Sequence, residues 1–302
     1  MDKNIDTYNW LNKTINEKEE KFVVDDLNEG INIDRDNKIV SFDSSHQENV
    51  DTNDYIHPYI IKNDVRGETV LSIFERKTNE VGNDGNPVIY ALKQMYNWRF
   101  NNPHQDIMNL LRRFVSVTKH LQMHFDTLLI TPSNNTLNRV IFGYLIRLIN
   151  FENSYSNFFL KLPVREVEEK YVDDNKLIQL SKENGIPPER VRRDMHNAFD
   201  RMYIENNGTF SYKYMKMLFH RDIIEQSLKL NFDKDEDMKY RNVINNKDVL
   251  VFDDTVASGK TLSDSANAIR EQFDPKSITF LTLFSPLNSD YQNKKNKFII
   301  KI

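Results

Sequence analysis

The stretch Val249-Leu-Val-Phe-Asp-Asp-Thr-Val-Ala-Ser-Gly-Lys-Thr261 determines how the rest of this sequence is interpreted. Its four leading apolar residues predict a short strand buried on both faces, as strands of parallel sheets are. That strand would end on two adjacent acids, Asp253 and Asp254. A turn of small residues follows and leads into a helical pattern, in which Leu262, Ala266, Ile269 and Phe273 share one face.

Strand and helix patterns alternate through most of the chain. Strands are expected at 126–131, 158–162, 228–232, 248–252 and 277–284, and helices at 103–123, 138–149, 164–205, 213–228 and 261–273. This alternation predicts an α/β fold with a mainly parallel sheet flanked by helices, in a Rossmann-like topology. Ligands of such sheets bind at the carboxyl ends of the strands, so the loops after Ile130 and Phe252 are the places to look for a site.

The first part of the chain has a different sequence pattern. Residues 1–105 are treated as an N-terminal extension or accessory region, and residues 106–302 as the α/β core. Within the extension, 59–61 and 69–74 have strand composition.

Composition excludes several classes of protein. With 39% apolar and 11% aromatic residues among 302, the chain has enough apolar material for a substantial core. Its 41 basic and 45 acidic residues are well mixed, so neither nucleic acid nor a membrane is expected as a partner. There is no cysteine, which removes disulfides, thiolate zinc sites and cysteine nucleophiles. The polar N-terminus and the lack of a roughly 20-residue apolar segment predict a soluble cytoplasmic protein.

The ending Gly259-Lys260-Thr261 also occurs in phosphate-binding P-loops, but that motif needs a glycine where Asp254 stands. Two carboxylates there would repel a polyphosphate. A sugar 5-phosphate suits the segment better, because Asp253 and Asp254 can accept hydrogen bonds from vicinal hydroxyls. The N–H groups at the start of the following helix, with the hydroxyls of Ser258 and Thr261, would bind the phosphate.

Two acids followed by TVASGKT closely resemble the phosphoribosyl-pyrophosphate (PRPP) loop of type I phosphoribosyltransferases (PRTases). The resemblance implies that Asp253 and Asp254 hold the ribose hydroxyls and stabilise an oxocarbenium-like transition state, with Thr255 facing the base. It implies a 5-phosphate loop of Ala257, Ser258, Gly259, Lys260 and Thr261, and a pyrophosphate loop of Ser133, Asn134, Asn135 and Thr136.

The implied reaction is the displacement of pyrophosphate from PRPP by a nitrogen nucleophile. Mg²⁺ would arrive bound to the substrate, without a direct protein ligand, and a homodimer would be in keeping with the family. Enzymes for 6-oxopurines carry an acid where Ala257 stands, so the resemblance disfavours that substrate class. Two alternatives stay open: a regulatory module that senses PRPP or a nucleotide without chemistry, and a related-fold enzyme that makes a pyrophosphorylated ribosyl donor from ATP.

Three further groups of residues have two interpretations each. Arg190, Arg192 and Arg193 could clamp pyrophosphate, although a solvated helix face paired with Glu189 and Asp194 is favoured. The SYKYMK stretch at 211–216 could stack a base, although an amphipathic helix start is favoured. His120 and His124 have helical spacing, but no third metal ligand is evident, so a structural or surface role is favoured.

Overall fold

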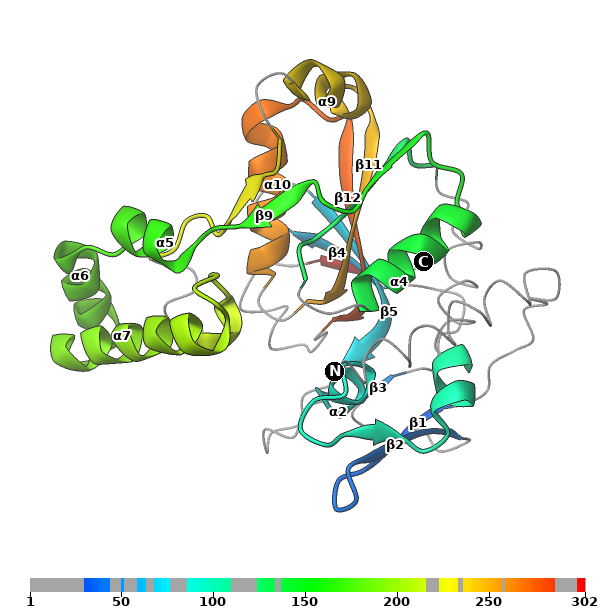
Figure 1. The fold of residues 1–302 in the computed structure, drawn as a ribbon, viewed down its shortest axis with the longest axis horizontal. Coiled ribbons are helices and arrows are strands. Elements are labelled where there is room, and N and C mark those ends of the chain that lie inside the picture. Colours follow the sequence, from blue (N-terminus) through cyan, green and yellow to red (C-terminus); the bar gives the residue numbers. More distant parts are fainter. Residues whose placement is uncertain are drawn as a thin grey trace. The chain divides into compact units, whose positions relative to one another are not determined.

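The structure is a computed structural model that describes residues 30–43, 50–51, 59–63, 68–76, 86–109, 124–133, 137–215, 223–232, 236–256, 259–285 and 298–301 (Figure 1). The chain divides into two compact units. Unit 1 comprises Met1–Ser156, Asn242–Ala257 and Pro275–Ile302, and unit 2 comprises Asn157–Arg241 and Ser258–Asp274.

Unit 1 is built on a sheet whose five central strands are all parallel. In spatial order they are β5 (Glu68–Arg76), β12 (Ser277–Ser285), β11 (Asp248–Thr255), β7 (Thr127–Ile130) and β8 (Asn153–Tyr155). Three strands extend it beyond β5 in antiparallel pairings: β4 (Tyr59–Asn63) and β3 (Val50–Asp51) pair with β5, and β13 (Phe298–Lys301) pairs with β4. The expected α/β class with a mainly parallel sheet is confirmed.

The core of unit 1 lies between this sheet and the helices packed against it, two of which position the site. One is α4 (Leu137–Leu148), whose buried Val140, Ile141, Tyr144 and Leu145 lie at helical spacing and pack with Leu128, Ile130, Leu250 and Phe252 of the sheet. The other is α2 (Asn86–Leu92), which contributes Val88, Ile89 and Leu92 to the same core. This packing matters for the site, because it attaches both helices rigidly to the central strands.

The N-terminal region is integrated with the sheet. Strands β4 and β5, from before residue 105, continue the sheet that β7, β11 and β12 form from residues after it. A second, three-stranded sheet of β1 (Gly30–Asp34), β2 (Ile39–Asp43) and β6 (Arg99–Phe100) also lies in this region. The domain boundary at 105 stays a prediction; strands on both sides of it share hydrogen bonds.

Unit 2 combines a short antiparallel pair with a helical layer. Among the described strands, β9 (Phe159–Lys161) and β10 (Leu228–Leu230) pair with each other and with no other strand, so the expectation that 158–162 and 228–232 belong to the main parallel sheet was wrong. Composition identified them as strands but could not assign their partners. The helices are α5 (Val164–Tyr171), α6 (Asp174–Asn184), α7 (Pro188–Glu205) and α10 (Lys260–Gln272), while α9 (Asp237–Ile244) crosses the unit boundary.

Local signals in the sequence set the ends of these helices. The Asp173 carboxylate accepts a hydrogen bond from the Lys176 amide at 2.9 Å and caps α6, which ends at Gly185 with a φ of 63°. Pro188 starts α7, where its missing N–H costs nothing. The buried side chains of α5, α6 and α7 form the core of this unit. The helical character expected for 164–205 is therefore confirmed (Figure 1).

The helix expected at 213–228 was wrong within the described residues. A single 3₁₀ turn, η1 (Tyr212–Tyr214), lies at its start, residues 223–227 are irregular and β10 begins at Leu228. Side-chain contacts explain the difference, because the Tyr212 hydroxyl and the amide of Ser227 both donate to Asp264 of α10. Such tertiary hydrogen bonds outweigh a weak local helical preference. The helix expected at 103–123 is seen for 103–109, and its remainder lies outside the described residues.

Candidate functional site

The order of the strands marks one place in unit 1 as the natural position for a ligand. From β7 the chain passes through α4 to β8 on one side, whereas from β11 it passes through α10 to β12 on the other. The gap between β7 and β11 is therefore a topological switch point, and open α/β sheets bind their ligands there, outside the carboxyl ends of the strands. Thr131 follows β7, and Asp253, Asp254 and Thr255 end β11.

The acid pair follows a strand that is buried throughout its centre. Val249 to Phe252 are at most 1% exposed, because β11 has parallel neighbours on both sides and both faces of the sheet are covered. Asp254 is itself only 7% exposed, and Asp253 is partly buried. Burying two adjacent carboxyl groups is costly unless they find partners, so their contacts show how the site is stabilised.

Two donors hold the carboxyl group of Asp253. The hydroxyl of Thr131 donates to Oδ1 at 2.8 Å, and the backbone amide of Asp254 donates to the same oxygen at 2.9 Å. Thr131 is only 2% exposed, and its own amide continues the strand ladder to the Phe252 carbonyl at 3.0 Å. None of the described residues hydrogen-bonds to Oδ2 of Asp253.

A lysine from the N-terminal region completes the cluster. The Lys93 ammonium forms an ion pair with Oδ2 of Asp254, and the two side chains are 20% and 11% exposed. The last turn of α2 positions this lysine, since the Lys93 amide donates to the Ile89 carbonyl at 2.9 Å. The sequence interpretation missed Lys93, because residues 1–105 carry no motif that connects them with the acids.

The electrostatic environment of Asp253 differs from that of an ordinary surface acid. Burial, together with the neighbouring charge of Asp254, raises the pKa of Asp253 from 3.8 to about 7, although the Thr131 hydrogen bond and the charge of Lys93 act in the opposite direction. Near neutral pH, Asp253 therefore retains a proton that an aspartate on the protein surface would have lost. Strong perturbation of a carboxyl group at a switch point is typical of functional sites.

Two further buried polar groups lie in the neighbouring segments without a partner among the described residues. One is the hydroxyl of Thr255, the last residue of β11 and the residue expected to face a base. The other is the side-chain amide of Asn138, which is 1% exposed in the first turn of α4. Buried polar groups are nearly always hydrogen-bonded in folded proteins, so each has unused bonding capacity.

The structure describes only part of the two expected loops. Ser133 lies just beyond β7 and is partly exposed, while Asn134, Asn135 and Thr136 lie outside the described residues, as do Ala257 and Ser258. Gly259 precedes α10 with a φ of 74°, a left-handed conformation that glycine adopts without strain. Thr261 is partly buried in the first turn of that helix.

Lys260 is engaged within unit 2. Its ammonium lies 2.9 Å from Oδ1 of Asp264, one helical turn further on, and donates to the Glu225 carbonyl at 2.8 Å. Asp264 is fully buried, and it also accepts hydrogen bonds from the Tyr212 hydroxyl at 2.9 Å and from the amide and hydroxyl of Ser227. Burial raises the pKa of Asp264 despite these partners. The sequence interpretation missed this buried acid, since its i, i+4 spacing from Lys260 also fits an exposed helix pair.

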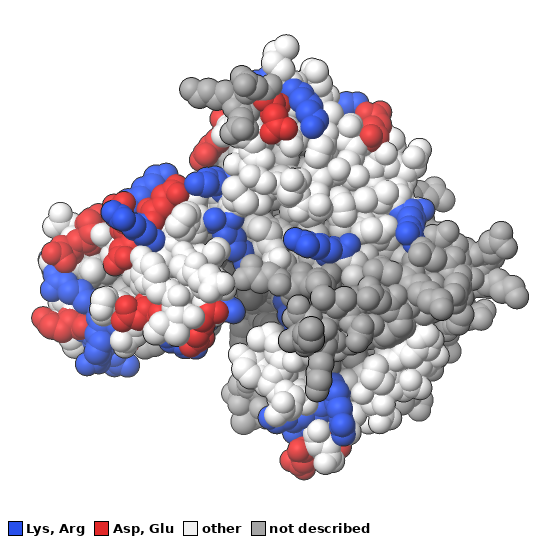
Figure 2. Space-filling view, viewed as in Figure 1, with Lys and Arg blue, Asp and Glu red and all other residues white. Residues whose placement is uncertain are grey.

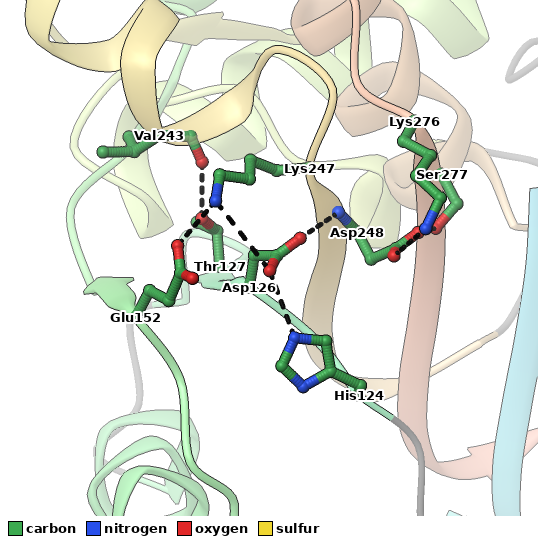
Figure 3. A network of polar contacts seen from close by, with 9 residues as sticks. All are labelled: His124, Asp126, Thr127, Glu152, Val243, Lys247, Asp248, Lys276 and Ser277. Carbon is green, nitrogen blue, oxygen red and sulfur yellow. Dashed lines mark hydrogen bonds and ion pairs between the residues drawn. The ribbon is translucent and has the colours of Figure 1, made fainter.

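The opposite, amino-terminal edge of the same sheet carries a second polar network (Figure 3). Asp126 accepts a hydrogen bond from the Asp248 amide at 2.8 Å, and Lys247 bridges from Glu152 at 2.6 Å to Asp126 at 4.0 Å. Asp248 is bonded to Lys276 and to the Ser277 hydroxyl, both at 2.6 Å. His124 is largely exposed and joins this network through Asp126 at 3.2 Å, in line with the structural or surface role favoured for it. His120 lies outside the described residues.

The remaining candidates lie on the surface of unit 2. Arg190, Arg192 and Arg193 are exposed on α7, and Arg192 pairs at 2.8 Å with Asp174 of α6 rather than with Glu189 or Asp194. Figure 2 shows basic and acidic side chains interspersed over the visible face of α5 to α7, without a patch of one sign. Lys213 lies 4.5 Å from the ring centre of Tyr214, which Arg201 also approaches at 5.3 Å. Lys216 lies outside the described residues.

Comparison of the chain with models of known protein families finds no match, and comparison with curated proteins finds none either. Among the described helices, none combines the length and apolar character that crossing a membrane requires. Within the same residues, no group of three or more His, Cys, Asp or Glu side chains is placed to hold a metal ion.

Proposed function

We propose that this chain binds phosphoribosyl pyrophosphate and transfers its phosphoribosyl group to a nitrogenous acceptor. One observation carries the proposal: the acid pair Asp253–Asp254 follows a central parallel strand at a topological switch point, and the sequence continues from it directly into TVASGKT. The acids suit the vicinal hydroxyls of a ribose, and the helix start after Gly259 suits its 5-phosphate.

The contacts of the acid pair support hydroxyl binding. Both donors to Asp253 reach Oδ1, so its Oδ2 remains for a ligand hydroxyl. With its pKa raised, Asp253 can either donate or accept a hydrogen bond near neutral pH. A ribose presents two neutral hydroxyls, each of which also donates and accepts, so it can satisfy both acids without adding charge to the buried site.

Lys260 has a different part in this proposal from the one its motif suggests. Because Asp264 and the Glu225 carbonyl engage its ammonium, the phosphate is bound by the N–H groups at the start of α10 and by the Thr261 hydroxyl. Lys260 then contributes by holding the first turn of α10 against the buried Asp264.

In the reaction, the bond between the anomeric carbon and the pyrophosphate oxygen breaks, and pyrophosphate leaves with the electron pair. The nitrogen of the acceptor forms the new bond to that carbon and afterwards releases its proton. Positive charge develops on the ribose ring in the transition state, and the nearby carboxyl groups of Asp253 and Asp254 stabilise it electrostatically. Mg²⁺ enters as part of the substrate, bound to its pyrophosphate; Lys93 already compensates Asp254, so the acid pair is not a ready-made metal site.

The test mixes the full chain with PRPP, Mg²⁺ and a panel of purine and pyrimidine bases and follows pyrophosphate release. We expect release with at least one base, and its loss in the Asp253→Asn/Asp254→Asn double variant. Release that persists in the double variant would disprove the site, and absence of both release and PRPP binding would disprove the function.

A second function is favoured by the Lys93–Asp254 ion pair, because a charged partner on one acid of the pair reduces its capacity to stabilise a cationic transition state. A chain that senses PRPP or a nucleotide would use the same binding residues without carrying out chemistry. Calorimetric binding of PRPP without turnover on any base would support this regulatory function over the enzymatic one.

A further inference from the structure

We propose that Lys93 is a specificity-determining residue: its ammonium occupies the place of a metal ion at the Asp253–Asp254 pair and so reserves the pair for uncharged hydroxyl groups. The choice of a ribose diol as the natural ligand rests on the proposed function. The exclusion of metal ions does not, since it follows from the contact between Lys93 and Asp254.

The first step of the argument is the chemistry of the pair itself. Two carboxyl groups at adjacent positions, partly withdrawn from water, are the kind of site to which Mg²⁺ or Mn²⁺ binds through one or two carboxylates. Nothing about Asp253 and Asp254 alone would favour a sugar over a cation. Discrimination between a sugar hydroxyl and a cation therefore requires a third group.

Lys93 lies where it can discriminate between these two kinds of ligand. Its ammonium contacts Oδ2 of Asp254 directly, and α2 holds it there through the buried Val88, Ile89 and Leu92. A divalent cation that bridged the two acids would have to displace this ammonium or lie against it, and like charges in a site of low dielectric repel strongly. A neutral hydroxyl meets no such repulsion.

The second step concerns the charge that remains. The Lys93 ammonium beside Asp254 offsets one of the two negative charges that the pair can carry. A less negative cluster repels a highly anionic ligand such as a sugar phosphate less than two bare carboxylates would. Lys93 therefore disfavours the binding of cations and favours the binding of anionic sugars.

The experiment measures Mn²⁺ binding to the full chain by electron paramagnetic resonance, with no nucleotide or sugar present. The wild type is compared with Lys93→Met, which removes the charge, and with Lys93→Arg, which keeps it. We expect Lys93→Met to gain one Mn²⁺ site per chain with affinity raised about tenfold or more, a difference of about 1.4 kcal/mol. Lys93→Arg should behave as the wild type does.

Two controls locate the new site. The gain should disappear when Asp253→Asn and Asp254→Asn are added to Lys93→Met. Lys276→Met, which removes the lysine paired with Asp248 at the other end of β11, should gain no Mn²⁺ site, because Asp248 keeps its bond from Ser277 and Lys247 still lies beside Asp126. A gain that survives the two Asn substitutions, or that Lys276→Met reproduces, would overturn the proposal.

Removing Lys93 takes one ion-pair partner from a buried carboxyl group, which destabilises a fold. Lys93→Gln gives a second route, because its amide can still donate one hydrogen bond to Asp254 without carrying charge. We expect Mn²⁺ to raise the melting temperature of Lys93→Gln and not that of the wild type, since an ion that binds only the folded state stabilises it. No gain of Mn²⁺ affinity or stability in either variant would refute the role of Lys93.

The outcome is separable from that of the proposed function. A wild type that fails to bind PRPP, with a Mn²⁺ gain in Lys93→Met, would disprove the function and leave the role of Lys93 intact. PRPP turnover in the wild type without any Mn²⁺ gain in the variants would do the reverse.

Discussion

Asp248 and Asp253 lie on the same strand, β11, yet their carboxyl groups experience opposite environments. Burial would raise the pKa of Asp248, but hydrogen bonds from Lys276 and Ser277 outweigh burial and lower it. At the other end of the strand, burial and the charge of Asp254 dominate and raise the pKa of Asp253. The sheet therefore has one edge where charges are stabilised and one where an acid is held in a costly state.

The comparison shows which edge of the sheet stabilises the fold and which edge reduces its stability. The amino-terminal edge, drawn in Figure 3, joins strands β7, β11 and β12 through complementary pairs. The carboxyl edge collects two acids, one lysine and a buried hydroxyl with no partner among the described residues. Proteins retain such unfavourable groups chiefly at functional sites, and the contrast is open to direct tests.

The largest expected effect is on ligand affinity. Asp254→Ala should weaken PRPP binding about 100-fold or more, because a hydrogen bond to a charged group contributes about 1.5–3 kcal/mol and Lys93 also loses its partner. Asp248→Ala, at the other edge, should leave affinity unchanged. Titration calorimetry of both variants checks this, and equal losses would remove the functional distinction between the edges.

The next effect concerns stability. Asp248→Ala removes the bonds to Lys276 and Ser277, so the free energy of unfolding should fall by about 2 kcal/mol in urea denaturation. The exposed pair Lys247–Glu152 offers a matched comparison, and Glu152→Gln should change stability by less than about 1 kcal/mol. A larger loss from Glu152→Gln would show that the network acts through its exposed members.

The two acids should also respond to pH with opposite signs. The pKa of Asp248 is lowered in the folded state, so its stabilisation is present above about 3.8 and is lost as the pH falls through the folded pKa. The pKa of Asp253 is raised, so its carboxyl group destabilises the fold most above about pH 7, and the cost is relieved between about 7 and 3.8.

Paired variants measure this difference. Asp253→Asn should stabilise the chain at pH 8, on the order of 1 kcal/mol, with the gain shrinking as the pH is lowered. Asp248→Asn should destabilise it at pH 8. Urea melts across this pH range test both, and the same pH trend in the two variants would contradict the assignment of environments.

The smallest effect is expected at Thr131. Thr131→Val keeps the shape of the side chain and removes the hydroxyl that donates to Asp253 at 2.8 Å, which should cost less than about 1 kcal/mol of stability. Because that hydrogen bond lowers the pKa of Asp253, its loss should move the pH midpoint of PRPP binding upward. An unchanged midpoint would show that Thr131 does not influence the acid.

Much of the local structure could be predicted because short-range physics decides it. The apolar run before Asp253 forms β11, and the spacing of Val140, Ile141, Tyr144 and Leu145 forms the buried face of α4. Where prediction failed, distant partners were decisive: in the described part of the helix expected at 213–228, Ser227 is not helical and bonds to Asp264, and β9 and β10 pair with each other.

The sequence by itself determined the strand, the acid pair and the glycine turn, since each depends on residues within one short segment. Only the tertiary structure decided that Lys93 contacts Asp254, that Thr131 donates to Asp253 and that Asp264 engages Lys260. The first two contacts join residues far apart in the chain, and the third depends on burial that helical spacing does not reveal. Strand order and side-chain burial set these contacts and the resulting pKa of Asp253, and neither is written in any local pattern.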